Sequence, residues 1–372
     1  MTTDPTDPTD PAAAEARRAL AQALMDSGDL TDSRWLLAFE EVPRHIFVPY
    51  FYGPSGERVS GDDPATRERW LTAVHEDRGL VTHRTGGAAT SSSSQPCLMA
   101  TMLEALAVGD GMRVLEIGAG TGYNAALLAH RLGDDRVTTV DITPDITGSA
   151  RERLAAAGYR PAVITGDGSL GVPDHAPYDR IIVTCGLTTV PPALLRQLTA
   201  DGFLLAPLGN ALARVHPTGP STATGRFLPH GAFFTPLRHT PAGGVPTRRP
   251  PVPTGPGRPS TLPAGAIADS RFRFLAGLAV PGLTWQYDRG EDGGITGARV
   301  WHPDGSIAEA RPDATVTEAG PRSLWTALEE AHRTYRNAGR PAPDRYGITV
   351  TTDEQRVWLD NPEGPGWTLG GR

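Results

Sequence analysis

Lysine is absent from this sequence: all 35 basic residues of the 372-residue chain are arginine. The absence excludes chemistry that requires a lysine ammonium group, such as Schiff-base catalysis and Walker A phosphate binding. Cysteine is scarce, and Cys97 and Cys185 are too isolated for a disulfide framework or a cysteine-rich zinc site. The ten histidines show no metal-ligand spacing such as His-Glu-x-x-His, so we expect no metal.

Long apolar runs and an excess of positive charge are also missing. No stretch approaches the roughly eighteen apolar residues of a membrane-spanning helix, and the N-terminal sequence MTTDPTDPTDP has no basic head or apolar core typical of a signal peptide. We therefore expect a cytoplasmic protein with no membrane partner. The net charge of −7 argues against a nucleic-acid partner, because such proteins usually carry a basic excess.

The chain is long for one domain, and its composition changes along its length. Residues 1–12 repeat Thr-Asp-Pro and are predicted to form a disordered tail. Residues 13–240 are predicted to form one domain with a helical N-terminal cover. In that cover, prolines at both ends of residues 42–49 predict a bend. The Pro-rich residues 241–263 are predicted to be a linker, and residues 264–372 a small α+β domain.

Short apolar runs alternate with helical segments in the middle of the chain. This rhythm is typical of βαβ units and predicts an α/β fold with a doubly wound, Rossmann-like parallel sheet. Further strands are expected at residues 212–215 and 225–228, and in the C-terminal domain a helix from Leu324 and a hairpin over residues 348–359. The predicted strands of the parallel sheet are residues 114–117, 137–140, 162–164, 181–183 and 203–205.

A run of hydroxyl side chains, residues 90–94, precedes Gln95 and Pro96. Four consecutive serines are consistent with a flexible linker. However, Leu98, Met102 and Leu106 follow at helical spacing, and Pro96 fits a first helical turn. We therefore favour a loop that is held in place by a helix N-terminus.

A glycine-rich loop, Gly118-Ala119-Gly120-Thr121-Gly122, follows the first strand of the predicted sheet. Glycines let the backbone approach a ligand closely, and a helix N-terminus offers free N–H groups. Glu116 precedes the loop, and Asp141 ends the next strand, where a carboxylate can bind both hydroxyls of a ribose. A nicotinamide dinucleotide remains the alternative ligand, although its Gly-x-Gly-x-x-Gly spacing is not present.

The third strand is followed by Gly166-Asp167-Gly168. An aspartate at this edge of the sheet can accept a hydrogen bond from an adenine amino group, although a solvated turn is the simpler interpretation of these three residues alone. Three acidic residues at successive strand ends, Glu116, Asp141 and Asp167, together favour a nucleoside site.

With these motifs in place, Val114 to Ala125 resembles motif I of the S-adenosylmethionine-dependent methyltransferases. Residues 42–49, the serine run, Gly166 to Gly168 and residues 191–208 are similar to protein-L-isoaspartate O-methyltransferases, over roughly residues 15–230. The resemblance implies a class I methyltransferase fold, S-adenosylmethionine as cofactor and an aspartyl carboxylate as methyl acceptor. It also implies a catalytic role for Ser94 and cofactor binding by Glu116, Gly118, Gly120, Asp141, Asp167 and Gly168. Thr121, Gly122 and Ile142 adjoin these residues and are predicted to join the same site.

The sequence departs from this family in two ways. Ser93 stands where an apolar residue is usual, and the repair enzymes lack a domain like residues 264–372. Extended homologues of this kind resemble enzymes of ribosomal peptide pathways, those of graspetides, lanthipeptides and lasso peptides. This resemblance implies a modified, macrocyclic precursor peptide as partner, whose aspartate is methylated and then closes to aspartimide, in some cases going on to isoaspartate. The alternatives are isoaspartyl repair in damaged proteins, and a non-catalytic scaffold with a methyltransferase fold.

The acceptor chemistry follows from the residue types alone. A carboxylate is already ionised at neutral pH, so it needs no general base to attack a sulfonium methyl group. Ser94, or alternatively Ser93, would donate a hydrogen bond that orients it. Thr82, His83 and Ser92 are candidates for the acceptor pocket, although a surface role for His83 is equally consistent. Most of the five tryptophans of the C-terminal domain are predicted to be core, with one or two left as peptide anchors.

Overall fold

The computed structural model describes residues 7–85, 87–240, 251–291 and 293–370, and the chain forms two compact units. The first unit takes its described residues from 1–185, 191–206 and 234–244. The second takes them from 186–190, 207–233 and 245–372. Part of the predicted linker, residues 241–250, and part of the predicted tail, residues 1–6, lie outside the described residues.

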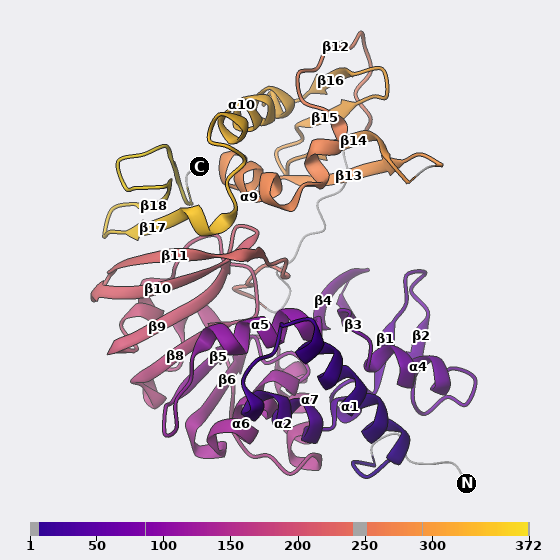
Figure 1. The fold of residues 1–372 in the computed structure, drawn as a ribbon, viewed down its shortest axis with the longest axis vertical. Helices are drawn as coiled ribbons and strands as arrows, with labels where there is room; N and C mark the ends of the chain where they lie inside the picture. The colour runs from indigo at the N-terminus through magenta and orange to yellow at the C-terminus, as the bar shows by residue number, and fades with distance from the viewer. Residues whose placement is uncertain (1–6, 86, 241–250, 292, 371–372) are drawn as a thin grey trace. The chain divides into compact units, whose positions relative to one another are not determined.

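A parallel sheet forms the centre of the first unit (Figure 1). Strand β5 (Val114–Ile117) lies between β6 (Val137–Asp141) and β8 (Tyr178–Val183) and is parallel to both. Strand β7 (Ala162–Thr165) pairs with β6, and β9 (Leu198–Leu208) pairs with β8. The order β9-β8-β5-β6-β7 confirms the predicted doubly wound sheet. The order in which the chain adds strands to the sheet reverses between β5 and β8, and open α/β sheets bind ligands at such a reversal.

Helices connect these strands and cover the unit. Helix α6 (Tyr123–Leu132) packs on β6, and α7 (Pro144–Ala156) packs on β6 and β7. Helix α8 (Pro192–Leu195) is a single turn before β9. At the N-terminus, α1 (Pro11–Asp26) begins where Asp10 accepts hydrogen bonds from the backbone N–H groups of Ala12 and Ala13, and it packs on α2 (Ser33–Glu41).

The segment predicted as a bend, residues 42–49, contains one turn of helix instead, α3 (Arg44–Phe47). The proline that was expected to prevent a helix, Pro43, is its N-cap residue, a position where no backbone N–H is needed. All four residues of α3 are buried. The neighbouring four-stranded antiparallel sheet has the order β2-β1-β3-β4. It comprises β1 (Tyr50–Tyr52), β2 (Arg58–Ser60), β3 (Leu80–Thr85) and β4 (Ala88–Ser93), with α4 (Arg67–Val74) between β2 and β3.

The serine run was predicted as a loop, and this was wrong for most of it. Ser91, Ser92 and Ser93 belong to β4, where they pair with His83, Val81 and Leu80 of β3. Pairing with a neighbouring strand satisfies the backbone groups that a free loop would leave to water. The helix that follows, α5 (Pro96–Leu106), begins as predicted with proline in its first turn.

The second unit contains two antiparallel groups of strands. Strands β10 (Ala211–Gly219) and β11 (Thr222–Gly231) confirm the predicted extra pair, and β17 (Tyr346–Val350) with β18 (Gln355–Leu359) confirms the predicted hairpin. Strand β17 also pairs with β11, and β19 (Gly366–Thr368) pairs with β18. The other group has the order β12-β16-β15-β14-β13. It comprises β12 (Arg258–Pro259), β13 (Thr284–Arg289), β14 (Ile295–Trp301), β15 (Ile307–Ala310) and β16 (Thr315–Ala319).

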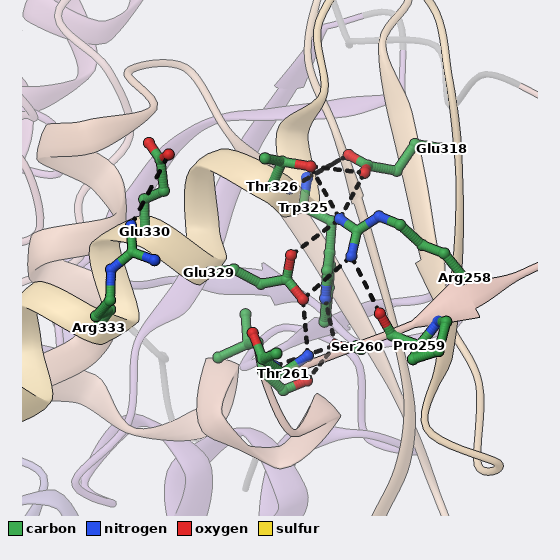
Figure 2. A network of polar contacts seen from close by, with 11 residues as sticks. Arg258, Pro259, Ser260, Thr261, Glu318, Trp325, Thr326, Glu329, Glu330 and Arg333 are labelled. Atoms are coloured by element: carbon green, nitrogen blue, oxygen red, sulfur yellow. Dashed lines mark hydrogen bonds and ion pairs between the residues drawn. The ribbon is translucent and has the colours of Figure 1, made fainter.

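Two helices, α9 (Ser270–Ala279) and α10 (Leu324–Asn337), pack together beside these strands. Glu318 of β16 accepts a hydrogen bond from the backbone N–H of Trp325 at the start of α10, with N···Oε1 of 2.7 Å (Figure 2). Nη2 of Arg258 lies 2.9 Å from Oε2 of Glu318 and 2.9 Å from Oε2 of Glu329. The indole Nε1 of Trp325 donates a hydrogen bond to the hydroxyl oxygen of Ser260 at 2.8 Å. The network joins β12, β16 and α10. No helix in the described part of the chain is long and apolar enough to cross a membrane.

Candidate active site

A cavity of about 830 Å³, counted with its open mouth, lies at the carboxyl ends of β5, β6 and β8. All of its lining residues belong to the first unit. It brings together six segments that are far apart in the sequence. These are residues 90–94 with Met99, residues 116–121 with Tyr123 and Asn124, residues 140–142, Gly168, Thr184 with Cys185, and residues 235–238.

The glycine-rich loop forms one wall of this cavity, and the structure leaves no room for a side chain at its first glycine. Gly118 has a φ of +101°, and a Cβ atom on it would lie 2.7 Å from the hydroxyl oxygen of Thr184. Gly120 has a φ of +51° and lies close to the backbone of Ser92. Thr121 also lines the cavity, whereas Gly122 does not; it caps α6 with a φ of +88°. The loop therefore presents bare backbone to a ligand.

Asp141 lines the cavity from the end of β6 together with Ile142. One carboxylate oxygen accepts a hydrogen bond from the backbone N–H of Gly120 at 3.2 Å, and the other accepts one from Thr143 at 3.2 Å. These bonds hold the carboxylate beside the glycine loop. Each oxygen retains acceptor capacity for a ligand hydroxyl.

Glu116 is completely buried and also lines the cavity. Asn124 donates to one of its oxygens at 2.7 Å, and the hydroxyl of Thr139 donates to the other at 2.6 Å. Burial raises the pKa of Glu116 to about 7, and these two hydrogen bonds only partly offset the effect. The carboxyl group therefore changes its charge near neutral pH. Asn124 was not among the site residues predicted from the sequence, because it carries no recognisable motif of its own.

Asp167, predicted to face an adenine, does not line the cavity, whereas its neighbour Gly168 does. Its carboxylate accepts a hydrogen bond from the backbone N–H of Ser169 at 2.9 Å and lies 3.2 Å from the ring Nδ1 of His239. Burial acts to raise the pKa of Asp167, but the bonds from Ser169 and His239 outweigh it and lower the pKa. The predicted role of Asp167 stays a prediction.

The predicted acceptor residues divide into two groups. Ser92, Ser93 and Ser94 line the cavity, and Ser93 is nearly fully buried. Thr82 and His83 do not line it. Nδ1 of His83 instead lies 2.6 Å from the hydroxyl of Thr90, which does line the cavity. His83 is thus one residue removed from the cavity wall.

A segment that the sequence analysis missed closes the cavity on another side. Residues 235–238 line it, and Nη2 of Arg238 lies 3.4 Å from the backbone oxygen of Thr90 and 3.2 Å from the hydroxyl of Thr143. The segment follows β11, far along the chain from the other motifs, and only folding brings it there. Among the described residues, no group of three or more histidine, cysteine, aspartate or glutamate side chains can hold a metal ion.

The sequence of this chain is similar to those of a family of known enzymes. The sequence profile of the family described as "Protein-L-isoaspartate(D-aspartate) O-methyltransferase (PCMT)" matches residues 65–218. The protein-L-isoaspartate O-methyltransferase of Methanococcoides burtonii is 36% identical over 192 residues, which are 51% of this chain and 82% of that protein. Protein-L-isoaspartate O-methyltransferase 1 of Syntrophobacter fumaroxidans is 32% identical over 232 residues, which are 62% of this chain and 92% of that protein.

The chain belongs to the protein-L-isoaspartate O-methyltransferase family. It is an S-adenosylmethionine-dependent carboxyl O-methyltransferase, as predicted. A solved structure titled protein-L-isoaspartate O-methyltransferase has the same fold, with a TM-score of 0.53 and 24% identity. That similarity covers 93% of this chain and all of the other.

Proposed function

We propose that the protein methylates an aspartate side-chain carboxylate in a cyclised ribosomal peptide, and that the resulting ester closes to an aspartimide. The observation that carries the methyl-transfer part of this proposal is the cavity itself. A row of serine hydroxyls, a bare glycine backbone and the Asp141 carboxylate line one space. A carboxylate acceptor and a nucleoside-bearing donor require these two kinds of surface side by side.

Bound S-adenosylmethionine supplies an electrophilic methyl group on a positively charged sulfur. Asp141 would accept hydrogen bonds from its ribose hydroxyls, and the backbone at Gly118 and Gly120 would let the ligand approach closely. Glu116, Thr121, Ile142 and Gly168 would complete the cofactor side of the cavity.

Ser94 would donate a hydrogen bond to one oxygen of the acceptor carboxylate and leave the other oxygen free to attack the methyl carbon. No base is needed, because the carboxylate is already ionised. Methyl transfer would form a C–O bond on the acceptor and break the sulfur–methyl bond of the donor, so that the carboxylate and sulfonium charges would be neutralised together. In the ester, methanol is then a leaving group that the backbone nitrogen of the following substrate residue can displace.

Replacing Ser94 by alanine is expected to lower kcat/KM for the peptide by about 100-fold, the range seen when one oriented donor is removed from an active site. Ser93→Ala is the matched control, because Ser93 neighbours Ser94 on the same cavity wall. We expect it to lower kcat/KM by less than about fivefold. Steady-state rates with both variants decide between the two serines. A large loss in Ser93→Ala alone would transfer the role to Ser93.

The buried carboxyl group of Glu116 leads to a separate prediction, that the affinity for S-adenosylmethionine depends on pH. Because its raised pKa is about 7, Glu116 is mostly protonated at pH 6 and mostly ionised at pH 8. If the cationic cofactor needs the ionised form, its affinity rises about tenfold over this range. Calorimetric titration of S-adenosylmethionine at the two pH values measures the change. Glu116→Gln should remove the pH dependence, and an unchanged pH dependence in that variant would contradict the assignment.

The second unit supports a peptide partner, and its five tryptophans divide as the sequence predicted. Trp301, Trp325 and Trp358 are buried and belong to the core, as predicted for most of the group. Trp285 and Trp367 are partly exposed, so they remain the candidates for peptide anchors. The exposed arginines of the same unit, Arg322, Arg333, Arg336 and Arg340, suit an acidic peptide segment.

A second function, repair of isoaspartyl residues in damaged proteins, is favoured by a different observation. The curated relatives carry the name protein-L-isoaspartate O-methyltransferase, and the likeness to a solved structure with that title extends over most of this chain. An extended C-terminal region therefore does not by itself require a cyclised substrate. In either function we infer a cytoplasmic enzyme, in keeping with the free thiols of Cys97 and Cys185.

Mass spectrometry of two parallel incubations with S-adenosylmethionine distinguishes these functions. One reaction contains a linear isoaspartyl peptide, and the other a cyclised, aspartate-containing precursor peptide from the same gene neighbourhood. Gain of a methyl group followed by loss of methanol on the cyclised peptide alone would support the proposal. Methylation of the linear peptide alone would establish repair.

A further inference from the structure

A buried arginine lies directly behind the serine strand. Arg44, the first residue of α3, has no exposed surface, and its Nη2 donates a hydrogen bond to the backbone oxygen of Ser94 at 3.3 Å. Its guanidinium carbon lies 5.0 Å from the centre of the Tyr123 ring. Both Ser94 and Tyr123 line the cavity, whereas Arg44 itself does not. The arginine therefore reaches the cavity only through these two neighbours.

The positive charge of Arg44 is poorly compensated within the fold. Among the described residues, its Nε and Nη1 atoms have no hydrogen-bond partner, and no carboxylate forms an ion pair with it. The groups that act on its charge are first Tyr123, whose hydroxyl stays neutral because burial raises its pKa to about 12, and then Asp77. Asp77 already accepts hydrogen bonds from the backbone N–H of Cys97 and the side chain of Gln95. An arginine keeps its charge even when buried, and an uncompensated buried charge is costly. A charge held at such a cost beside a cavity is a candidate for a functional role.

We propose that Arg44 is the positioning residue for the methyl acceptor: it holds the backbone of Ser94 and places a positive charge behind the site that receives the substrate carboxylate. This inference rests on the proposed carboxyl methylation, but not on whether the peptide is linear or cyclised, since both acceptors carry a carboxylate.

The positive charge of Arg44 should affect the acceptor and the methylated product differently. In a poorly solvated site, a cation attracts an ionised carboxylate strongly and a neutral methyl ester only weakly. Arg44 would therefore favour binding of the acceptor and release of the ester, without contributing to the affinity for the cationic cofactor. Its loss should raise the KM of the acceptor more than it lowers kcat.

The test compares Arg44→Met, which removes the charge but keeps much of the volume, with Arg44→Lys, which keeps the charge. Arg131→Met is a matched control. The side chain of Arg131 is 6% exposed and two of its nitrogens also lack partners, but its ion pair is with Asp110, away from the cavity lining. The acceptor is whichever of the two peptides described above the unaltered enzyme methylates.

We expect Arg44→Met to raise the acceptor KM by about tenfold or more, with kcat changed by less than about threefold. On a logarithmic scale, the increase in KM in Arg44→Lys should be at most half of the increase in Arg44→Met. The calorimetric Kd for S-adenosylmethionine should not rise. The inference is overturned if Arg44→Lys is as impaired as Arg44→Met. It is also overturned if cofactor affinity falls in parallel, or if Arg131→Met shows the same increase in KM.

A second measurement separates this inference from the proposed function. Hydrogen–deuterium exchange over residues 90–99 of the full-length protein with S-adenosylmethionine needs no acceptor. Faster exchange there in Arg44→Met than in Arg131→Met, with unchanged exchange in the strands of the parallel sheet, supports the positioning role even if neither peptide is methylated. Equal exchange in the two variants would overturn it.

Discussion

Replacing Asp141 by alanine is expected to weaken S-adenosylmethionine binding by about 100-fold or more. Each hydrogen bond to a charged group contributes ~1.5–3 kcal/mol, and two ribose hydroxyls would lose their acceptor together. The substitution also removes the bonds that Asp141 accepts from the backbone of Gly120 and Thr143, so the glycine loop itself loses support. Calorimetric titration of the variant measures the loss directly.

Two further variants make this prediction specific. Asp141→Asn keeps the shape of the side chain and one acceptor oxygen, so it should bind with an affinity between those of the alanine variant and the unaltered protein. Asp145→Asn removes an exposed carboxylate from the first turn of α7, four residues away, and should bind normally. If Asp141→Ala retains the unaltered Kd, the cofactor does not contact the end of β6.

Replacing Trp325 by alanine is expected to lower the free energy of unfolding of the second unit by ~3–5 kcal/mol, the range for removing a large aromatic side chain from a core. Trp325 has no exposed surface, and its loss leaves a cavity at the first turn of α10. It also leaves the hydroxyl of Ser260 without the indole donor drawn in Figure 2. Denaturant unfolding followed by circular dichroism, with hydrogen exchange in α10, measures the change.

The control for this variant is Trp367→Ala in β19. Trp367 lies on a short edge strand and is partly exposed, so its removal should cost less than about half as much free energy. An equal loss of stability in the two variants would mean that the packing around Trp325 does not determine the stability of the unit. Cofactor binding should survive in both variants, because the cavity is lined entirely by residues of the first unit.

Local sequence patterns were sufficient to predict the parallel sheet, and the glycine loop and Asp141 at its edge. The β5 strand was predicted with its observed bounds, and β6 and β7 to within a residue, because buried parallel strands are short apolar runs bounded by polar turns. The glycine loop and Asp141 were predictable for a similar reason. The glycine loop and Asp141 each lie at a strand end, and the carboxyl ends of parallel strands meet at one edge of the sheet.

Interactions between distant segments were not predictable in this way. The serines were assigned to a loop because their composition is that of a linker, yet pairing with β3 makes most of them a strand. Polar strands of this kind gain their structure from a partner, and that partner cannot be read from the strand itself. The single turn of α3 was missed similarly, since four residues carry too little periodicity to be recognised.

The sequence by itself determined the fold class, the family and the chemistry of the donor side, because these depend on motifs within short stretches of chain. Only the tertiary structure decided which other groups contact those motifs and how deeply their side chains are buried. Folding buries Glu116 and so moves its pKa to about 7, brings Arg238 to the cavity, and leaves the charge of Arg44 behind Ser94. Burial and long-range contact set these properties, and neither is a property of residues that are neighbours in the sequence.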